Sequence, residues 1–358
     1  MNRRELEARI QGREGEHPVI ESRDFSGVEL AGAQLQGGIF YSTAFRGAVL
    51  RGADLRESLF MDCDFTGADL RGADLSRTKL MQGTIGEADC SGCAAESLVL
   101  AETEGAGSVW TEACMDNGVL GGGDLTGARF TGIRAEKMVL AGCRLDDVDL
   151  SGARLVEPNL AASTGMRGLR LSGAAIERGT FQDLALEDYD FRDMALSDCQ
   201  FLEASLPGAD FSGLDLGQCG FKGAELTGAR FDRTVTRYAM FLEADLSRAS
   251  LRGAGLQQAL LIGANLAGAE LAGADLEMAM LREARCPEAG FVGARLRYAD
   301  LSQADLTGAD LSRAELYQAK LHRIREEKTI WDGSSRDQAK ETDEKRAEAE
   351  DFRPAGKG

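Results

Sequence analysis

Few side chains in this sequence of 358 residues are spaced to do chemistry together. The two histidines, His17 and His322, lie near opposite ends, so we expect neither a Ser-His-Asp nor a Cys-His set within one chain. Cys90 and Cys93 have the spacing of a zinc-binding pair, but the sequence has no second pair and no histidine near them. The sequence therefore predicts no catalytic residue, no metal site and no cofactor, and we expect a protein that is not an enzyme.

The elements that position these residues are set by an apolar period of five. Between residues 246 and 321 a leucine or phenylalanine stands at nearly every fifth position, and an alanine stands two residues before nearly every one. A step of five residues turns a helix by about 140° and puts alternate repeats on opposite faces of a flat strand, so it fits neither element. Each pentad must therefore contain a corner, which lets the bulky residue and the alanine point to a common axis.

Individual pentads carry a family resemblance. Ala264–Gly268, Ala304–Gly308 and Ala309–Arg313 resemble the A(D/N)Lxx unit of pentapeptide repeat proteins. The resemblance implies a right-handed, four-sided β-helix with one pentad on each side. We therefore expect an all-β solenoid, a right-handed quadrilateral β-helix of about 15 coils, with short helical caps at the termini.

Phenylalanines support four pentads per coil. Phe201, Phe221 and Phe241 recur every twenty residues, which is the pattern that stacked coils of four pentads would give. The bulky residue falls on multiples of five up to Leu160 and one residue later from Leu171 onward. One inserted residue in this interval explains the shift of register.

The repeat divides the chain into five parts. We expect an N-terminal cap over 1–19, a first-register solenoid over 20–160, a register slip or loop over 161–170, a second-register solenoid over 171–321, and a C-terminal cap with a charged tail over 322–358. Within the first register, residues 85–118 place Gly105 and Trp110 in bulky positions. Looser coils or a small loop are expected there.

Most of the eight cysteines occupy inward positions of the repeat. Cys63, Cys143, Cys199 and Cys219 stand where alanine is usual, so they are interpreted as small, reduced core residues. Cys199 and Cys219 are twenty residues apart and would lie on adjacent coils. A disulfide between them is the alternative, because the expected Cα separation of about 5 Å allows one.

The net charge of −18 argues against nonspecific binding to nucleic acid or to an anionic membrane, since both favour Lys and Arg clusters. The sequence shows no secretory signal and no run of about 18 apolar residues. We therefore expect a cytoplasmic protein, with signal-independent export left open.

Acidic residues suggest a second possibility. Many pentads carry an aspartate before the bulky residue, and quinolone-resistance members of the resembled family are understood to protect DNA gyrase by resembling DNA. The resemblance thus implies, as the alternative function, an acidic DNA mimic that binds a DNA-handling enzyme such as gyrase. Arginines such as Arg51 and Arg252 share the outward positions, however, which favours a mixed solvated surface.

One side of the predicted coil differs from the other three. Sorted by a period of twenty, its outward positions are apolar, whereas those elsewhere are mostly Asp, Arg, Ser and Thr. These apolar residues, here called the apolar strip, are Ile39, Tyr41, Leu59, Met61 and Met81 in the first register, Leu202, Met240, Leu242, Leu260, Ile262 and Met280 in the second, and Tyr238, Met278 and Tyr298 at the adjoining corner. If the inserted residue leaves the number of pentads unchanged, both parts fall on the same side.

A contiguous exposed apolar patch usually marks a contact surface. The sequence therefore predicts an interaction scaffold that binds a protein partner, or forms a homodimer, through the apolar strip. Direct nucleic-acid and membrane partners are not expected. Coverage of the strip by the chain's own tail, and an absence of any role, are the alternatives.

Overall fold

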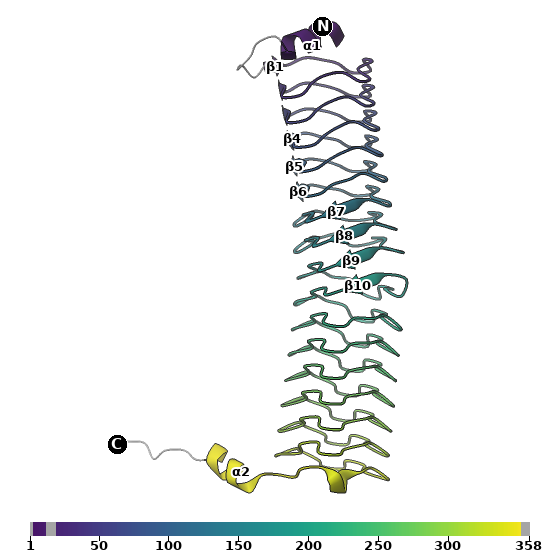
Figure 1. Cartoon of the computed structure of the whole chain (residues 1–358), viewed down its shortest axis with the longest axis vertical. Coiled ribbons are helices and arrows are strands. Elements are labelled where there is room, and N and C mark those ends of the chain that lie inside the picture. The colour runs from purple at the N-terminus through teal and green to yellow at the C-terminus, as the bar shows by residue number, and fades with distance from the viewer. Residues whose placement is uncertain (1–2, 12–18, 352–358) are drawn as a thin grey trace, which may run out of the picture. The chain divides into compact units, whose positions relative to one another are not determined.

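The computed structural model describes residues 3–11 and 19–351. Contacts divide the chain into two compact units. Unit 1 comprises Met1–Ala185 with Asp193–Leu196, and unit 2 comprises Leu186–Arg192 with Ser197–Gly358. Each unit is a solenoid of stacked coils (Figure 1).

Each pentad buries two side chains and then turns. Leu261 and the small residue two positions before it, Ala259, are both fully buried. The two residues after Leu261 form the turn, which closes when the Ala264 N–H donates to the Leu261 carbonyl oxygen at 3.1 Å. The second turn residue, Gly263, has a φ of +67°. Glycine accepts this conformation without Cβ strain, which explains why so many pentads end in glycine.

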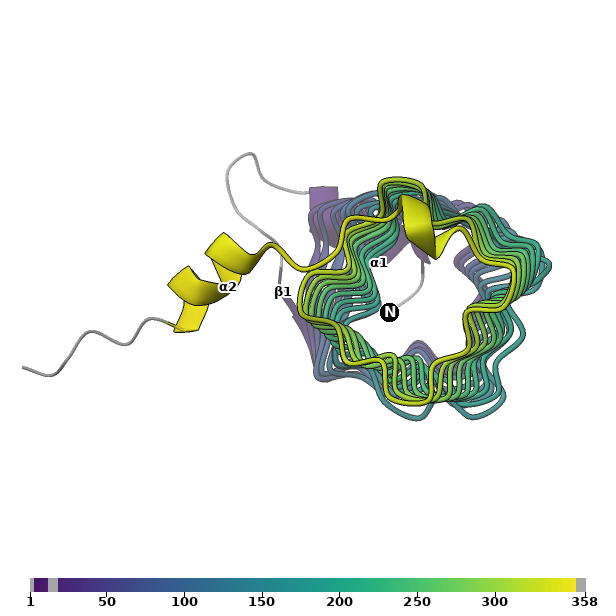
Figure 2. The same cartoon turned by 90° about the horizontal axis from the view of Figure 1, so that it is seen from below.

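Parallel pairing links residues twenty positions apart. Ile39 pairs with Leu59 in unit 1, and Met240 pairs with Leu260 in unit 2. Four pentads thus complete one coil, which gives the four-sided outline of the coils in Figure 2. The predicted all-β quadrilateral solenoid is confirmed. The predicted total of about 15 coils spans both units and stays a prediction.

Aromatic rings stack in the core as the twenty-residue period predicts. In unit 2 the ring centroids of Phe201 and Phe221 lie 5.0 Å apart, and those of Phe221 and Phe241 lie 4.9 Å apart, with nearly parallel planes. Such offset pairs add favourable contacts beyond the burial of their apolar area.

In residues 3–11 and 19–351, ten short strands fall into two parallel sheets. The six-stranded sheet has the order β1 to β6, with β1 (Val19–Glu21), β2 (Ile39–Tyr41), β3 (Leu59–Met61), β4 (Lys79–Met81), β5 (Val99–Ala101) and β6 (Val119–Gly121). The four-stranded sheet has the order β10-β9-β8-β7, with β7 (Arg134–Glu136), β8 (Arg154–Val156), β9 (Ala175–Glu177) and β10 (Ala195–Ser197). Elsewhere the coils are joined by single bridges.

Residues 85–118 keep the regular register, so the looser coils expected there do not form. Asp89 pairs with Val109 in the same twenty-residue step. Trp110 is fully buried, its indole N–H donates to Ser108 Oγ at 2.9 Å, and that hydroxyl donates to the Gly105 carbonyl oxygen at 2.7 Å. The large Trp110 is thus accommodated because the preceding bulky position holds Gly105, and the indole nitrogen has a hydrogen-bond partner.

One extra residue enters unit 1 between Thr164 and Arg170. Arg144 pairs with Thr164, twenty residues on, whereas Asp149 pairs with Arg170, twenty-one residues on. Gly165 has a φ of +64°, and a Cβ there would lie 2.8 Å from the Arg144 Cγ. The insertion therefore sits where the backbone adopts a conformation that suits glycine.

The first coil of unit 1 is covered by α1 (Arg3–Gln11). Leu6 and Ile10 of this helix are buried. The Arg3 guanidinium donates to the carbonyl oxygens of Ala31 and Gly32 at 2.5 and 2.8 Å, and Glu7 accepts the N–H of Gln34 at 3.0 Å. The predicted helical cap is present, and it satisfies backbone groups that an open end would leave unpaired.

The C-terminal end of unit 2 carries two short helices, as the predicted helical cap requires. Helix α2 (Glu344–Asp351) stands beside the coils and outside their ring (Figure 2). The last coil includes the short helix η1 (Arg336–Gln338). The guanidinium of Arg336, its first residue, lies 3.0 Å from a Glu326 carboxylate oxygen and 4.9 Å from the Trp331 ring centroid. Glu326, Trp331 and Arg336 occupy the positions where leucine is usual, so polar and aromatic side chains cover the end of the apolar core.

Candidate interaction surface

The unit 1 part of the apolar strip lies on the outer face of the six-stranded sheet. In β2 and β3 the central residues Phe40 and Phe60 are buried, and strand alternation turns their neighbours outward. Ile39 is in register with Leu59, and Tyr41 is in register with Met61, which is in register with Met81 of β4. These outward side chains are half-buried because each is flanked by its neighbours in the ladder.

The strip narrows along this sheet. Lys79 follows Leu59 in the first outward ladder, and Ala101 and Gly121 follow Met81 in the second. The first ladder regains apolar character at Val99 and Val119. The broadest apolar area in unit 1 therefore lies over β2 and β3.

The unit 2 part consists of two ladders on one side of the coils. Met240, Leu260 and Met280 are bridged in register, and the same ladder then continues to Asp300. In the other ladder the N–H of Glu243, which follows Leu242, donates to the Ile262 carbonyl oxygen at 3.0 Å. These residues are half-buried. Leu202 belongs to the same ladder as Leu242, but Lys222 lies between them in the twenty-residue register.

The corner beside these ladders carries the most exposed residues of the strip. Tyr238, Met278 and Tyr298 are 48%, 52% and 46% exposed. Gln258 lies between the first two, and its Nε2 donates to the Tyr238 hydroxyl oxygen at 3.2 Å. The Tyr298 ring meets Tyr317 edge-on at a centroid distance of 5.5 Å. The side chains with the greatest freedom to contact another molecule thus lie at this corner.

The two parts of the strip belong to different units. Their predicted alignment on one side is therefore still a prediction. Within unit 2, the hydrogen bonds between α2 and the coils are to Gln303, His322 and Arg323, which are not residues of the strip.

Sequence reasoning missed the role of His322. This residue is 3% exposed, although the sequence analysis noted only its place near one end of the chain. Its Nδ1 accepts the N–H of Asp343 at 3.1 Å, and its Nε2 lies 3.2 Å from a Glu350 carboxylate oxygen. The twenty-residue period was the available signal, because it carries the ladder of Leu242 and Ile262 on to His322. The other histidine, His17, lies outside the described residues.

Many of the outward acids are paired with arginines. Asp69 lies 2.7 Å from Arg71 and 2.5 Å from Arg51, and the hydrogen bond from Arg71, supported by Arg51, holds the pKa of its carboxyl well below the usual range. Asp54 pairs with Arg56 at 2.6 Å, and this arginine lowers the Asp54 pKa. The surface therefore alternates in sign over short distances.

The eight cysteines are present as thiols, and all but Cys114 are buried. Cys90 and Cys93 both point into the core, where burial raises the pKa of the Cys93 thiol to about 12. Over residues 3–11 and 19–351, no group of three or more His, Cys, Asp or Glu side chains is arranged to hold a metal ion. In the same ranges, no helix has the length and apolar character needed to cross a membrane.

Comparison with known families agrees with this geometry. The model for pentapeptide repeats matches the chain in eight copies, over residues 43–82, 124–160, 186–223, 218–253, 249–285 and 289–325. The chain therefore belongs to the pentapeptide repeat family.

Similar solved structures include QnrB1, a plasmid-mediated fluoroquinolone resistance protein, at 17% identity over 60% of this chain and 93% of that chain, with a TM-score of 0.40. A second is HetL, a pentapeptide repeat protein involved in heterocyst differentiation regulation from the cyanobacterium Nostoc sp. strain PCC 7120. It is 24% identical over 77% of this chain and 86% of that chain, with a TM-score of 0.21. No curated protein is close enough in sequence to count as a relative.

Proposed function

We propose that the chain is a non-enzymatic scaffold that binds a protein partner, or a second copy of itself, through the apolar strip. The observation that carries the proposal is the in-register stacking of apolar residues on outward positions. Ile39 with Leu59, Tyr41 with Met61, and Met240 with Leu260 form such ladders. Outward positions on other sides carry ion pairs such as Arg51 with Asp69. An apolar patch on an otherwise polar surface favours association.

The physical advantage of such a scaffold is rigidity. Met240 exchanges backbone hydrogen bonds with the preceding coil, and its neighbours Ala239 and Phe241 bond to the following coil, so little conformational freedom is lost when a partner binds. Binding would thus depend on shape and apolar area, with the exposed corner residues Tyr238, Met278 and Tyr298 as the first points of contact.

The experiment replaces three apolar side chains in the unit 2 ladders with serine. The triple variant Met240→Ser, Leu260→Ser, Ile262→Ser is compared with Val235→Ser, Val292→Ser, which removes outward apolar residues from other sides of the same unit. Self-association is measured by light scattering, and partner binding by mass spectrometry of proteins that co-purify from native cells.

The triple variant is expected to lose dimerisation or partner capture by about tenfold or more, while the control keeps both. Both variants are expected to unfold at the wild-type temperature, since the replaced groups are not fully buried. Unchanged behaviour of the triple variant in both assays would reject the strip as the binding surface.

A further inference from the structure

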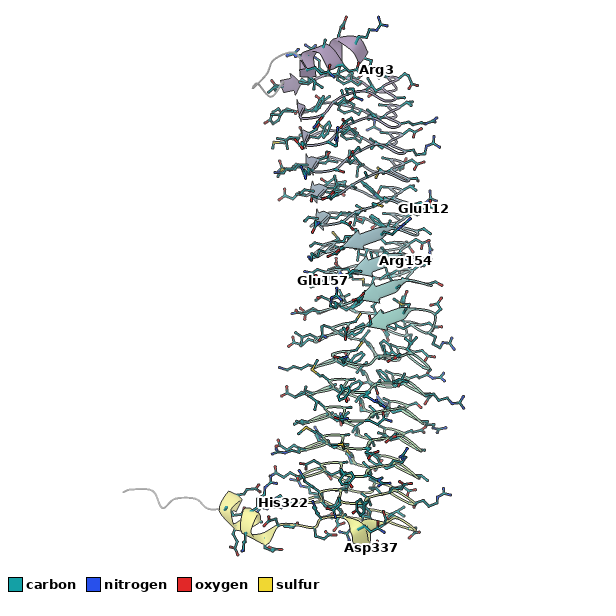
Figure 3. All side chains as sticks on the ribbon, in the orientation of Figure 1. Arg3, Glu112, Arg154, Glu157, His322 and Asp337 are labelled. Atoms are coloured by element: carbon teal, nitrogen blue, oxygen red, sulfur yellow. The ribbon has the colours of Figure 1, made fainter. Side chains whose placement is uncertain are left out.

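Helix α2 is held against one side of unit 2 through the carboxylate of Glu350. One oxygen lies 3.2 Å from His322 Nε2, 3.4 Å from the Arg323 guanidinium and 3.4 Å from Gln303 Nε2. The other accepts from Arg346 of the same helix at 2.8 Å. Since His322 Nδ1 accepts a backbone N–H, its Nε2 carries the proton and donates to Glu350. Figure 3 shows His322 beside α2, on the side that faces the coils.

The start of α2 is fixed by the same two solenoid residues. The N–H of Asp343 donates to His322 Nδ1 at 3.1 Å, and the N–H of Arg323 donates to the Thr342 hydroxyl at 3.1 Å. The Asp343 carboxylate in turn accepts the N–H of Arg346 at 3.1 Å, which is a typical N-cap. His322 and Arg323 therefore recognise both ends of a short acidic helix.

The attachment has little apolar content. Of the eight residues of α2, Ala347 alone is buried. A helix of this length is unstable by itself in water, so its conformation depends on the surface that it contacts. Because the ion pair of Glu350 with Arg323 lies near solvent, salt and competing carboxylates weaken it. Such a helix can be displaced without disturbing the core.

This surface continues one ladder of the apolar strip. Along the twenty-residue register, the carbonyl oxygens of Ile262, Arg282, Ser302 and His322 each accept an N–H from the preceding coil, at 2.7–3.0 Å. Ser302 is 1% exposed and His322 is 3% exposed. Helix α2 therefore lies at the C-terminal end of the ladder that contains Leu242 and Ile262.

We propose that Gln303, His322 and Arg323 form a binding site for an acidic helix of a protein partner, and that α2 occupies this site in the free chain as a displaceable cover. The helix that fits has a capping aspartate and, seven residues later, a carboxylate, as Asp343 and Glu350 do. Recognition of one helix face by a fixed surface is a common mode of peptide binding. The proposal rests on the proposed function, since it assigns the partner's chemistry at one end of the strip.

The test uses the full-length chain and a fluorescein-labelled peptide with the sequence of residues 341–351. The variant Glu350→Lys opens the site by placing a positive charge beside Arg323, and Glu348→Lys is the matched control, because Glu348 is exposed on the same helix. Fluorescence anisotropy is expected to show that the peptide binds Glu350→Lys at least about tenfold more tightly than wild type or Glu348→Lys. Adding Arg323→Glu to Glu350→Lys is expected to reverse this gain.

Amide hydrogen exchange identifies each outcome. The α2 amides are expected to lose protection in Glu350→Lys while the coil amides keep theirs. Continued protection of α2, no peptide binding to the opened chain, or binding that survives Arg323→Glu would each overturn the proposal. The strip variant Met240→Ser, Leu260→Ser, Ile262→Ser is expected to bind the peptide normally in the Glu350→Lys background, so failure of the strip and failure of this site are distinguishable.

Discussion

The small inward position of each pentad accepts polar residues because the preceding coil supplies a backbone carbonyl oxygen as hydrogen-bond acceptor. Ser58 Oγ donates to the Leu35 carbonyl oxygen at 2.8 Å, and Thr78 Oγ1 donates to the Leu55 carbonyl oxygen at 2.7 Å. The Cys63 thiol lies 3.5 Å from the Phe40 carbonyl oxygen in the same arrangement. A buried hydroxyl or thiol is therefore satisfied, and serine, threonine and cysteine can replace alanine there.

Thiol reactivity follows from this placement. Burial raises the pKa of Cys219 and Cys286 to about 12, which leaves almost no thiolate at neutral pH, whereas Cys114 is exposed. We expect an aromatic disulfide reagent to modify one thiol of the native chain within minutes and the others after denaturation. The variant Cys114→Ser is expected to show no rapid reaction. Rapid loss of two or more thiols from the native wild type would contradict the buried, reduced core.

At the scale of the element, the repeated unit is the pentad. Its register decides whether the bulky and small side chains point into the core. Deletion of Gly165 would bring Met166 into the bulky position and leave Gly168 at the corner, where its φ of +70° is already suitable. The deletion thus restores the twenty-residue step through this part of unit 1.

We therefore expect deletion of Gly165 to change the unfolding temperature by less than about 3 °C in a thermal scan. Deletion of Gly142 is the control, since it removes another glycine with positive φ from a regular coil. There, loss of one residue shifts later inward side chains toward solvent, so we expect a lower melting temperature and a broadened transition. Equal effects of the two deletions would show that the insertion is a required part of unit 1.

At the scale of the whole molecule, 59 acidic residues outnumber 41 basic ones, which gives the net charge of −18, and many of these acids form ion pairs. Asp275 lies 3.1 Å from Arg295, and Asp300 lies 3.0 Å from Lys320, in addition to the pairs around Asp54 and Asp69. A DNA mimic needs rows of carboxylates that stay unpaired, as phosphates are along a duplex. The pairing does not favour the acidic DNA mimic, which stays an alternative prediction.

We accordingly expect purified DNA gyrase to supercoil DNA equally well with and without this protein, in the presence and in the absence of a quinolone. An unrelated protein of similar net charge is the control for nonspecific charge effects. Inhibition of supercoiling, or protection from the quinolone, at stoichiometric amounts would favour the alternative over the scaffold.

The sequence by itself determined the solenoid, because a period of five with a small residue two positions before each bulky one requires a corner in every pentad, and the resemblance to pentapeptide repeats implied its four sides. It also located the register change between Leu160 and Leu171 and the outward apolar residues, since each depends on counting along the chain. Only the tertiary structure decided how Trp110 is packed and where α2 lies. Trp110 fits because Gly105 and Ser108 adjust around it, and α2 stands beside the coils because His322 and Arg323 bind its charged groups. Both results depend on side-chain contacts between different elements, which no period in the sequence encodes.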